Sequence, residues 1–386
     1  MSTATLPVET ADPTNARILA VSEDKIQGFR PDPLAEIARQ SDLDLPTVAD
    51  RIIAMLQAGT IRRVRQTLMS INLAHGALVA WRIPPEKLNA AFDFMWEKDP
   101  FSGHIVIRST DKETPGSQYR LWTTLKIPDG YSMQKHGELL CKITGAESFK
   151  LMPAKCVFAL GVGHVRRRGM PPGSKSDHVA EPHDTKYVQL TDEEWRVLTA
   201  LKRELSPEEL TRAASRPPEF FWQDRAAESG EPLEEFLRVG AALHARGVIG
   251  RFSTFLEHVK PNAAGERVTQ YNALFHWAVP QGREMQTGQE VGRFHIMTHA
   301  YWREGGPEFN NVNIMGVVHG TDRTMVLAHK AAIDEHLAQI GGGGIPVSYT
   351  NVFWGGRSEI KPSEISPFAY ADWCRAQSVA PESMCS

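Results

Sequence analysis

The sequence has few cysteines, no long apolar run and no excess of positive charge. Its four cysteines include no Cys-x-x-Cys pair, which excludes a disulfide framework and indicates a reducing, cytoplasmic environment. No apolar stretch reaches about 18 residues, so we expect no membrane span. The net charge of −3 gives no support to a dedicated nucleic-acid binder, which usually carries a basic face.

What the 386-residue sequence does contain is an internal repeat. Both halves carry Gly-x-Ile-x-Arg, then Trp-x-x-Pro, then His-x-x-x-Arg, then a β-rich run that ends in Lys or His. The matching segments are, in order, 59–63 with 247–251, 81–84 with 277–280, 104–108 with 299–303, and 119–126 with 312–319. Four matches in the same order indicate a tandem duplication.

Each copy is predicted to contain a helical part followed by a β-rich part. In the first copy, 17–66 has helical spacing, with Gly59 at the end of a helix and an extended run at 61–68, which is the order of a winged helix-turn-helix. Residues 76–160 then read as the ferredoxin-like order βαββαβ. The fold class is therefore α+β, a tandem repeat of winged helix-turn-helix plus ferredoxin-like domain.

The domain boundaries follow from this pattern and from a segment between the copies that is rich in Pro, Gly and charge. They are a disordered lead-in at 1–16, winged helix 1 at 17–68, ferredoxin-like domain 1 at 69–164, a linker at 165–188, winged helix 2 at 189–253, ferredoxin-like domain 2 at 254–355, and a C-terminal tail at 356–386.

This architecture resembles the Lrp/AsnC family of transcription regulators, and four motifs resemble the siroheme decarboxylases in their fused two-copy form. That family shows Arg-Arg/Arg-Phe after the wing, a Ser-His-Cys-Tyr-x-Arg strand, a strand that ends in His-Gly, and a late Ser-Thr-Arg-Glu motif. The corresponding segments here are 250–252, 298–303, 313–320 and 356–361, while the family's Trp-Pro-Tyr triplet is missing from both copies. The resemblance implies decarboxylation of the acetate side chains of siroheme, or of a related iron tetrapyrrole, in haem-type cofactor biosynthesis.

Such a substrate needs cations for its carboxylates and a source of protons. Arginine binds carboxylates in a bidentate manner, and histidine exchanges protons near neutral pH. We therefore expect His299 and His319 to be catalytic, with His299 donating the proton or approaching the iron. His295, Met297, His299, Tyr301 and Arg303 are expected to share one face of a strand. The candidate substrate-binding residues are Arg251, Tyr301, Arg303, Asn313 and Arg357 in the second copy, and His104, Arg108, Arg120 and Lys126 in the first, where they form a second site or extend the same cradle.

Structural roles and metal binding are the alternatives for these residues. A single strand histidine is more often structural, and the repeated His-x-x-x-Arg makes the two roles equally weighted for His299. His295, His299 and His319 have no neighbouring carboxylate, so no metal site is predicted. His178, Glu181, His183 and Asp184 have the spacing of metal ligands, but their Pro/Gly-rich surroundings favour a solvated loop. No organic cofactor is expected, since the iron tetrapyrrole is itself the substrate or ligand.

Two other functional classes stay open: a ligand-responsive regulator of the Lrp/AsnC type, and a tetrapyrrole carrier or sensor without turnover. The expected recognition helix at 47–58 has Arg51 beside Asp50 and few other basic groups, and its counterpart at 234–246 begins with two glutamates. Helices that read DNA present several donors and cations, so DNA binding is not expected. The two copies are expected to pair as an intramolecular pseudo-dimer, with a homodimer as a further option.

Overall fold

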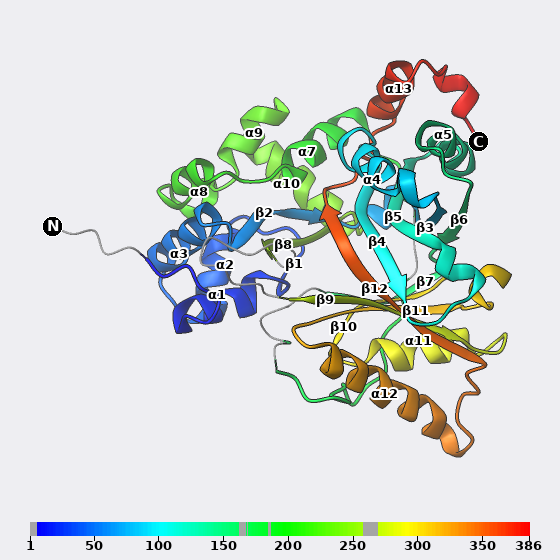
Figure 1. Cartoon of the computed structure of the whole chain (residues 1–386). Helices are drawn as coiled ribbons and strands as arrows, with labels where there is room; N and C mark the ends of the chain where they lie inside the picture. Colours follow the sequence, from blue (N-terminus) through cyan, green and yellow to red (C-terminus); the bar gives the residue numbers. More distant parts are fainter. Residues whose placement is uncertain (1–5, 162–166, 168, 184–186, 258–268) are drawn as a thin grey trace. The chain divides into compact units, whose positions relative to one another are not determined.

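The computed structural model describes residues 6–161, 167, 169–183, 187–257 and 269–386, and its contacts divide the chain into two units. Unit 1 consists of 1–72, 162–168 and 188–270, and unit 2 consists of 73–161, 169–187 and 271–386. Like segments of the two copies therefore belong to the same unit: the helical segments to unit 1 and the β-rich segments to unit 2 (Figure 1). The predicted α+β class is confirmed.

Unit 1 places helices from both copies around a small three-stranded sheet. Its elements are α1 (Pro13–Ser22), β1 (Ile26–Gln27), α2 (Pro33–Ser41), α3 (Leu45–Gln57), β2 (Ile61–Leu68), α7 (Asp192–Lys202), α8 (Pro207–Ala214), α9 (Gln223–Ser229), α10 (Leu233–Ala245) and β8 (Ile249–Leu256). The extended runs expected to be separate wings pair with each other, because β8 lies between β1 and β2 in an antiparallel sheet.

Local sequence sets where these helices begin. Asp32 and Asp44 accept hydrogen bonds from the backbone N–H groups of the first turns of α2 and α3, and proline stands within the first turn of each. Thr191 and Ser206 form capping boxes with glutamates three residues later. The described part of the expected disordered lead-in is also fixed, because the Asn15 side chain donates to the carbonyls of residues 7 and 9.

Unit 2 is built on one nine-stranded sheet. Its strands are β3 (Ala74–Arg82), β4 (Ser102–Thr110), β5 (Tyr119–Pro128), β6 (Ser148–Pro153), β7 (Cys156–Leu160), β9 (Tyr271–Ala278), β10 (Met297–Trp302), β11 (Ile314–Gly320) and β12 (Tyr349–Ile360). The spatial order is β6-β3-β5-β4-β12-β9-β11-β10-β7. We call β3 to β6 the first β half and β9 to β12 the second β half. Each half has the strand order 4-1-3-2 of a ferredoxin-like unit.

The two halves meet at two seams that are equivalent by the repeat. At one seam, the second strand of the first half, β4, pairs with the last strand of the second half, β12. At the other, β10 pairs with β7, which continues the last strand of the first half beyond Pro153. Because β6 and β7 are consecutive pieces of the segment 148–160, the two ends of the sheet belong to one stretch of chain, and the sheet curls.

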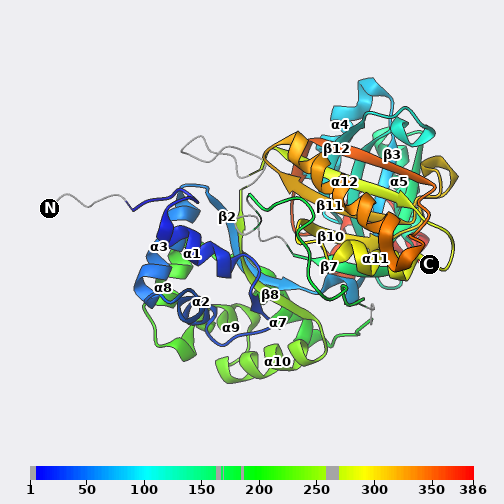
Figure 2. The same ribbon diagram turned by 90° about the horizontal axis from the view of Figure 1, so that it is seen from below.

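Helices cover the outer face of the curled sheet (Figures 1 and 2). The first half carries α4 (Leu88–Glu97), α5 (Met133–Thr144) and α13 (Pro367–Ala376), and the second carries α11 (Glu284–Gly292) and α12 (Arg323–Gln339). Each half has its own core between sheet and helices. A third core fills the inner face of the sheet and includes Val106, Trp122, Leu274, Met315 and Phe353 from both halves.

The segment expected to be a C-terminal tail is part of the fold. Strand β12 runs on to Ile360, and α13 places Tyr370, Trp373 and Cys374 in the core of the first half. The Trp373 indole N–H also donates to the Lys98 carbonyl at 2.8 Å. Part of the expected linker is also packed into the fold. The backbone of Lys175 forms an isolated antiparallel β-bridge with Phe294, and that of His183 forms one with Val157. Among the described residues, no helix combines the length and apolar character required to cross a membrane.

Candidate active site

The strand registers place the repeated motifs at equivalent positions of the two halves. Val106 faces Trp122 across β4 and β5, just as Tyr301 faces Met315 across β10 and β11. Both pairs of strands also contain an irregularity at the same place, after Ser102 in one half and after Met297 in the other. Counting from these anchors equates His104 with His299, Arg108 with Arg303, and Lys126 with His319, as the repeat in the sequence requires.

A chain of polar contacts on the inner face joins Arg108 on β4 of the first half to side chains on β9, β11 and β10 of the second half. The Arg108 guanidinium Nη1 donates to Asn272 Oδ1 at 3.1 Å, and Asn272 Nδ2 lies 3.2 Å from His319 Nε2. Thr298 Oγ1 lies 3.4 Å from His319 Nδ1 and 3.3 Å from His299 Nδ1. Three predicted residues, the two histidines and Arg108, are therefore brought together, and we call this set of five side chains the histidine cluster.

Tyr301 and Arg303 extend this arrangement along β10. The imidazole of His299 and the ring of Tyr301 stack with centroids 6.1 Å apart, and the Arg303 guanidinium lies 4.3 Å from the centre of the Tyr301 ring. Burial raises the pKa of Tyr301 and lowers that of Arg303. Tyr301 thus links the histidine cluster to the seam formed by β10 and β7.

The expectation that all odd positions from His295 to Arg303 share one face is wrong at its start. Met297 packs in the outer core of the second half, because the bulge that follows it shifts the alternation by one residue. His295 precedes the strand, and its backbone N–H donates to the Ser174 carbonyl. Only His299, Tyr301 and Arg303 lie on the inner face as predicted.

Arg108 and Arg303 make matching contacts at the two seams. Arg108 Nη1 donates to the carbonyl of Phe353 in the second half at 3.2 Å, and Arg303 Nη1 donates to the carbonyl of Met152 in the first. Phe353 and Met152 are themselves equivalent positions of the last strands. The two arginines are only 4% and 8% exposed, and burial lowers the pKa of Arg108 to about 9. The repeated His-x-x-x-Arg motif therefore has a structural use: its arginine ties each half to the other.

The remaining candidates of the first half lie on the same inner face but make other contacts. His104 Nε2 lies 2.8 Å from Ser358 Oγ across the β4–β12 seam. Arg120 is exposed, and its Nε donates to the Arg108 carbonyl at 2.8 Å. Lys126 is half-buried on β5. Arg120 and Lys126 are thus cations of the inner face that solvent still reaches.

Three further predicted substrate-binding residues, all from the second copy, have side chains that lie outside the cluster and its extension along β10. Asn313 is buried and both accepts from and donates to the Val279 backbone, so it braces the start of β11. Arg357 pairs with Asp93 of α4 and packs over the Phe92 ring on the outer face. Arg251 belongs to unit 1, where its Nε donates to the Glu23 carbonyl and burial lowers its pKa.

Reasoning from the sequence missed four polar residues of the inner face: Asn272, His276, Thr298 and Asn351. His276 is fully buried against Trp122, Phe309 and Phe353, and neither of its ring nitrogens has a hydrogen-bond partner. Burial, followed by the charges of Arg108 and Lys330, lowers its pKa to about 3. The available signal was the alternation of residues 272, 274 and 276 on β9, which share a face with the predicted His319.

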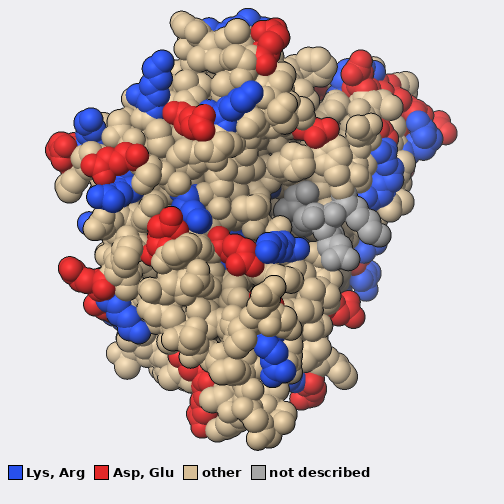
Figure 3. Space-filling model, turned by 90° about the vertical axis from the view of Figure 1, so that its right-hand side faces the viewer, with Lys and Arg blue, Asp and Glu red and all other residues tan. Residues whose placement is uncertain are grey.

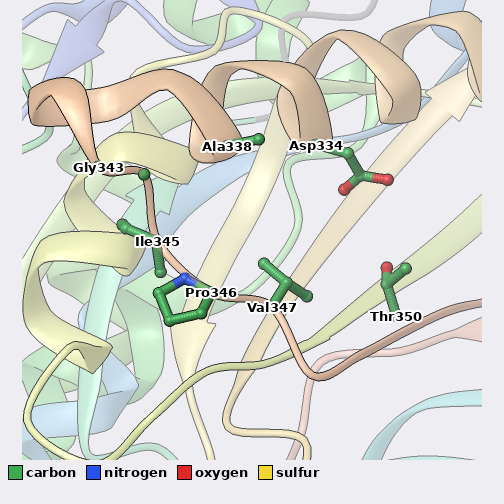
Figure 4. Close-up of a pocket in the computed structure, with 8 residues that line it drawn as sticks. Asp334, Ala338, Gly343, Ile345, Pro346, Val347 and Thr350 are labelled. Atoms are coloured by element: carbon green, nitrogen blue, oxygen red, sulfur yellow. The ribbon is translucent and has the colours of Figure 1, made fainter.

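Of the linker residues with the spacing of metal ligands, Asp184 lies outside the described residues, and His178, Glu181 and His183 are not members of this cluster; neither is any residue of a separate hollow. In the part of the chain that the structure describes, no three His, Cys, Asp or Glu side chains converge as metal ligands. A hollow of about 400 Å³ lies between the end of α12 and the start of β12 (Figure 4). It is lined by Asp334, Ala338, Thr350 and the segment 343–347, and contains none of the predicted site residues.

Comparison with known proteins agrees with this organisation. A family model described as the AsnC-like ligand binding domain matches residues 73–159 and 269–340, one segment from each copy of the repeat. Two crystal structures of the siroheme decarboxylase NirDL, one in co-complex with an iron-uroporphyrin III analogue, have TM-scores of 0.63 and 0.62 at 18% identity. Each comparison covers 94% of this chain and 99% of NirDL. No curated protein matches the chain. The resemblance to the siroheme decarboxylases that the motifs predicted is confirmed at the level of the fold.

Proposed function

We propose that this chain decarboxylates acetate side chains of siroheme or of a closely related iron tetrapyrrole, in haem-type cofactor biosynthesis. The observation that carries the proposal is the histidine cluster, which joins both predicted catalytic histidines on the inner face of the second half. Support comes from the fold, which resembles that of a siroheme decarboxylase whose co-complex contains an iron-uroporphyrin III analogue. A non-catalytic tetrapyrrole carrier is the alternative that uses the same site.

The reaction requires one proton for each acetate. The bond between the methylene carbon and the carboxylate carbon breaks, carbon dioxide leaves, and the electron pair stays on the methylene carbon next to the conjugated ring. A proton from His299 or His319 converts that carbon to a methyl group, and solvent then reprotonates the histidine. The chemistry needs no organic cofactor, because the macrocycle itself delocalises the electron pair.

We assign the binding of carboxylates first to Arg120 and Lys126, because these two cations of the inner face remain accessible. Arg108 and Arg303 are buried and already donate to carbonyls at the seams. Arg251 and Arg357 lie outside the cluster, and their role as carboxylate ligands stays a prediction. An arginine engaged by a carboxylate gains charge-assisted hydrogen bonds, so Arg120→Ala should weaken binding of the substrate more than turnover.

The test is anaerobic incubation of the purified chain with siroheme, followed by absorption spectra and mass analysis of the pigment. Successive losses of carbon dioxide establish the decarboxylase, and His299→Gln should then abolish them. Binding without a change in pigment mass identifies a carrier or sensor. Absence of binding refutes a tetrapyrrole function.

The second candidate, a ligand-responsive regulator with winged helices that read DNA, is disfavoured by the contacts of two arginines in unit 1. Arg51 of α3 is engaged by Asp12 and by the Pro7 carbonyl, and Arg238 of α10 pairs with Glu235 on its own helix. Basic and acidic side chains are interspersed on the face shown in Figure 3. We infer that the helical segments are scaffold; specific binding of a duplex by the purified chain would contradict this.

A further inference from the structure

We propose that Arg108 and Asn272 are positioning residues that keep His319 neutral, with its ring proton on Nδ1. The inference rests on the proposed function and assigns the protonation state of one of its two histidines. Arg108 comes from the first β half and the other members of the cluster come from the second. The first half would thus complete the site of the second.

Arg108 fixes which way the Asn272 amide points. A guanidinium has only donors, so the atom of Asn272 that faces Arg108 Nη1 at 3.1 Å must be the acceptor Oδ1. The amide nitrogen Nδ2 then faces His319 Nε2 at 3.2 Å and donates to it. A nitrogen that accepts a hydrogen bond carries no proton, so neutral His319 holds its proton on Nδ1.

Thr298 supports the same assignment from the other side of the His319 ring. Its hydroxyl donates to the Val317 carbonyl at 2.9 Å, which uses its only proton. The two lone pairs of Thr298 Oγ1 then accept from His319 Nδ1 and from His299 Nδ1, at 3.4 and 3.3 Å. Both histidines therefore present Nδ1–H to the same oxygen.

A second proton on His319 would disrupt these hydrogen bonds. The proton would sit on Nε2 and face the N–H of Asn272, so two donors would oppose each other unless the amide turned. Turning the amide would aim its N–H groups at the Arg108 cation. The cluster therefore opposes an imidazolium at His319.

The first half lacks this arrangement at its equivalent positions. Gly76, Gly103 and Lys126 stand where the second half has Asn272, Thr298 and His319. A Cβ atom at Gly103 would lie 2.3 Å from the side-chain Oγ of Ser363, so a counterpart of Thr298 would have to displace the Ser363 hydroxyl. The arrangement that holds His319 between Asn272 and Thr298 therefore belongs to the second half and has no counterpart at the equivalent positions of the first.

The experiment is nitrogen-15 NMR of the histidine rings in the full-length chain without substrate, with the His319 signals assigned through His319→Gln. We expect the Nε2 of His319 to show the shift of an unprotonated nitrogen and its Nδ1 that of a protonated one. Asn272→Asp retains the contact with Arg108 but replaces the donor at His319 by an acceptor. In that variant His319 should become protonated at Nε2.

The matched control is Asn351→Asp, the same chemical change at a buried asparagine whose amide nitrogen has no partner and whose Oδ1 accepts from Thr110. It should leave the His319 signals unchanged. A His319 that is protonated at Nε2 in the unmodified chain, or that does not respond to Asn272→Asp, overturns the inference. The wild-type spectrum decides even if a variant does not fold.

The spectra and the pigment assay separate the two proposals. If siroheme is not converted but His319 has the expected form, the proposed function fails and the positioning role stands as a property of the fold. If siroheme is converted but His319 is protonated at Nε2, the proposed function stands and the positioning role of Arg108 and Asn272 fails. Where both proposals hold, Asn272→Asp should lower kcat about 10- to 100-fold with little change in KM. This is the size expected when a residue that orients a functional group through a hydrogen bond is replaced.

Discussion

His276 shows how the environment of a single residue shapes stability. It is a titratable ring enclosed by aromatic side chains, and its pKa is about 3 because burial and the Arg108 and Lys330 charges oppose protonation. The unfolded chain has the ordinary histidine pKa of about 6.5, so it takes up a proton that the folded chain refuses. The stability contributed by the neutral ring is thus complete above about pH 6.5 and is lost as the pH falls from there toward 3.

The prediction is that His276→Leu flattens the acid dependence of stability. Between pH 7 and pH 5 the wild-type chain should lose about 2 kcal/mol more free energy of unfolding than the variant, because one group titrates only in the unfolded state. Urea unfolding at the two pH values measures the difference. His75→Gln, at an exposed histidine paired with Asp129, is the control and should behave as wild type. Equal pH dependence in all three proteins would contradict the argument.

Arg303 offers a second test at the scale of one residue. Its guanidinium ties β10 to the Met152 carbonyl and covers the Tyr301 ring. Arg303→Ala should lower the free energy of unfolding by about 2–4 kcal/mol, because it leaves a cavity and removes a charged hydrogen bond. Arg375→Ala, which removes an exposed ion pair with Asp372, should cost less than about 1 kcal/mol. Similar midpoints in urea for the two variants would show that the seam does not depend on Arg303.

Among the helices and strands, α13 is the one whose packing was hardest to predict from the sequence. Its segment follows the last strand of the second half, and only the fold shows that it packs on the first half. Tyr370, Trp373 and Cys374 make this contact. The helix begins at Pro367, and the Ser366 side chain caps its first turn. Local propensity shows that a helix can form there, but it does not show which surface the helix covers.

The packing of α13 gives a direct prediction. Trp373 is 8% exposed and Phe368, five residues earlier on the same helix, is 68% exposed. Trp373→Ala should destabilise the chain by about 3–5 kcal/mol, as expected for a large aromatic side chain in a core. Phe368→Ala should change stability by no more than about 0.5 kcal/mol. Thermal or urea unfolding compares the two, and equal effects would mean that α13 is not docked.

The bulge in β10 limits what alternation alone can predict. His299, Tyr301 and Arg303 share the inner face as the period of two requires, whereas Met297 lies on the other face because one residue is inserted in the ladder. A bulge leaves no clear mark in a single sequence. The same holds for Asn272 and Thr298, whose importance depends on which strands become neighbours.

At the scale of the whole molecule, the internal repeat predicted most of unit 2. The order βαββαβ in each copy and the equivalence of His104 with His299 both agree with the strand registers. The pairing of β2 with β8, and of β4 with β12, could not be predicted, because a repeat shows that two segments are alike without showing that they exchange neighbours. The likeness to the Lrp/AsnC family was predicted from the order of helices and strands, and it is supported by the two segments that match the AsnC-like ligand binding domain.

The difference between the two halves predicts where turnover occurs. His299→Gln should abolish conversion of siroheme, because it removes a histidine to which the proposed reaction assigns the proton. His104→Gln, at the equivalent position of the first half, should leave more than about half of the activity, because the first half has Lys126 where the second half has His319. Mass analysis of the pigment after equal incubation measures both. Loss of activity in the two variants alike would place a working site in each half.

The paired arginines at the seams bear on how such a chain can evolve. In a homodimer of one gene product, every substitution appears twice, so a site and its symmetry mate are preserved or lost together. Fusion removes that coupling, since Arg108 and Arg303 are encoded separately, as are Lys126 and His319. An arginine that joins the halves is then useful in both of them, whereas a histidine of the cluster is needed in one half and the equivalent position of the other half can be a lysine.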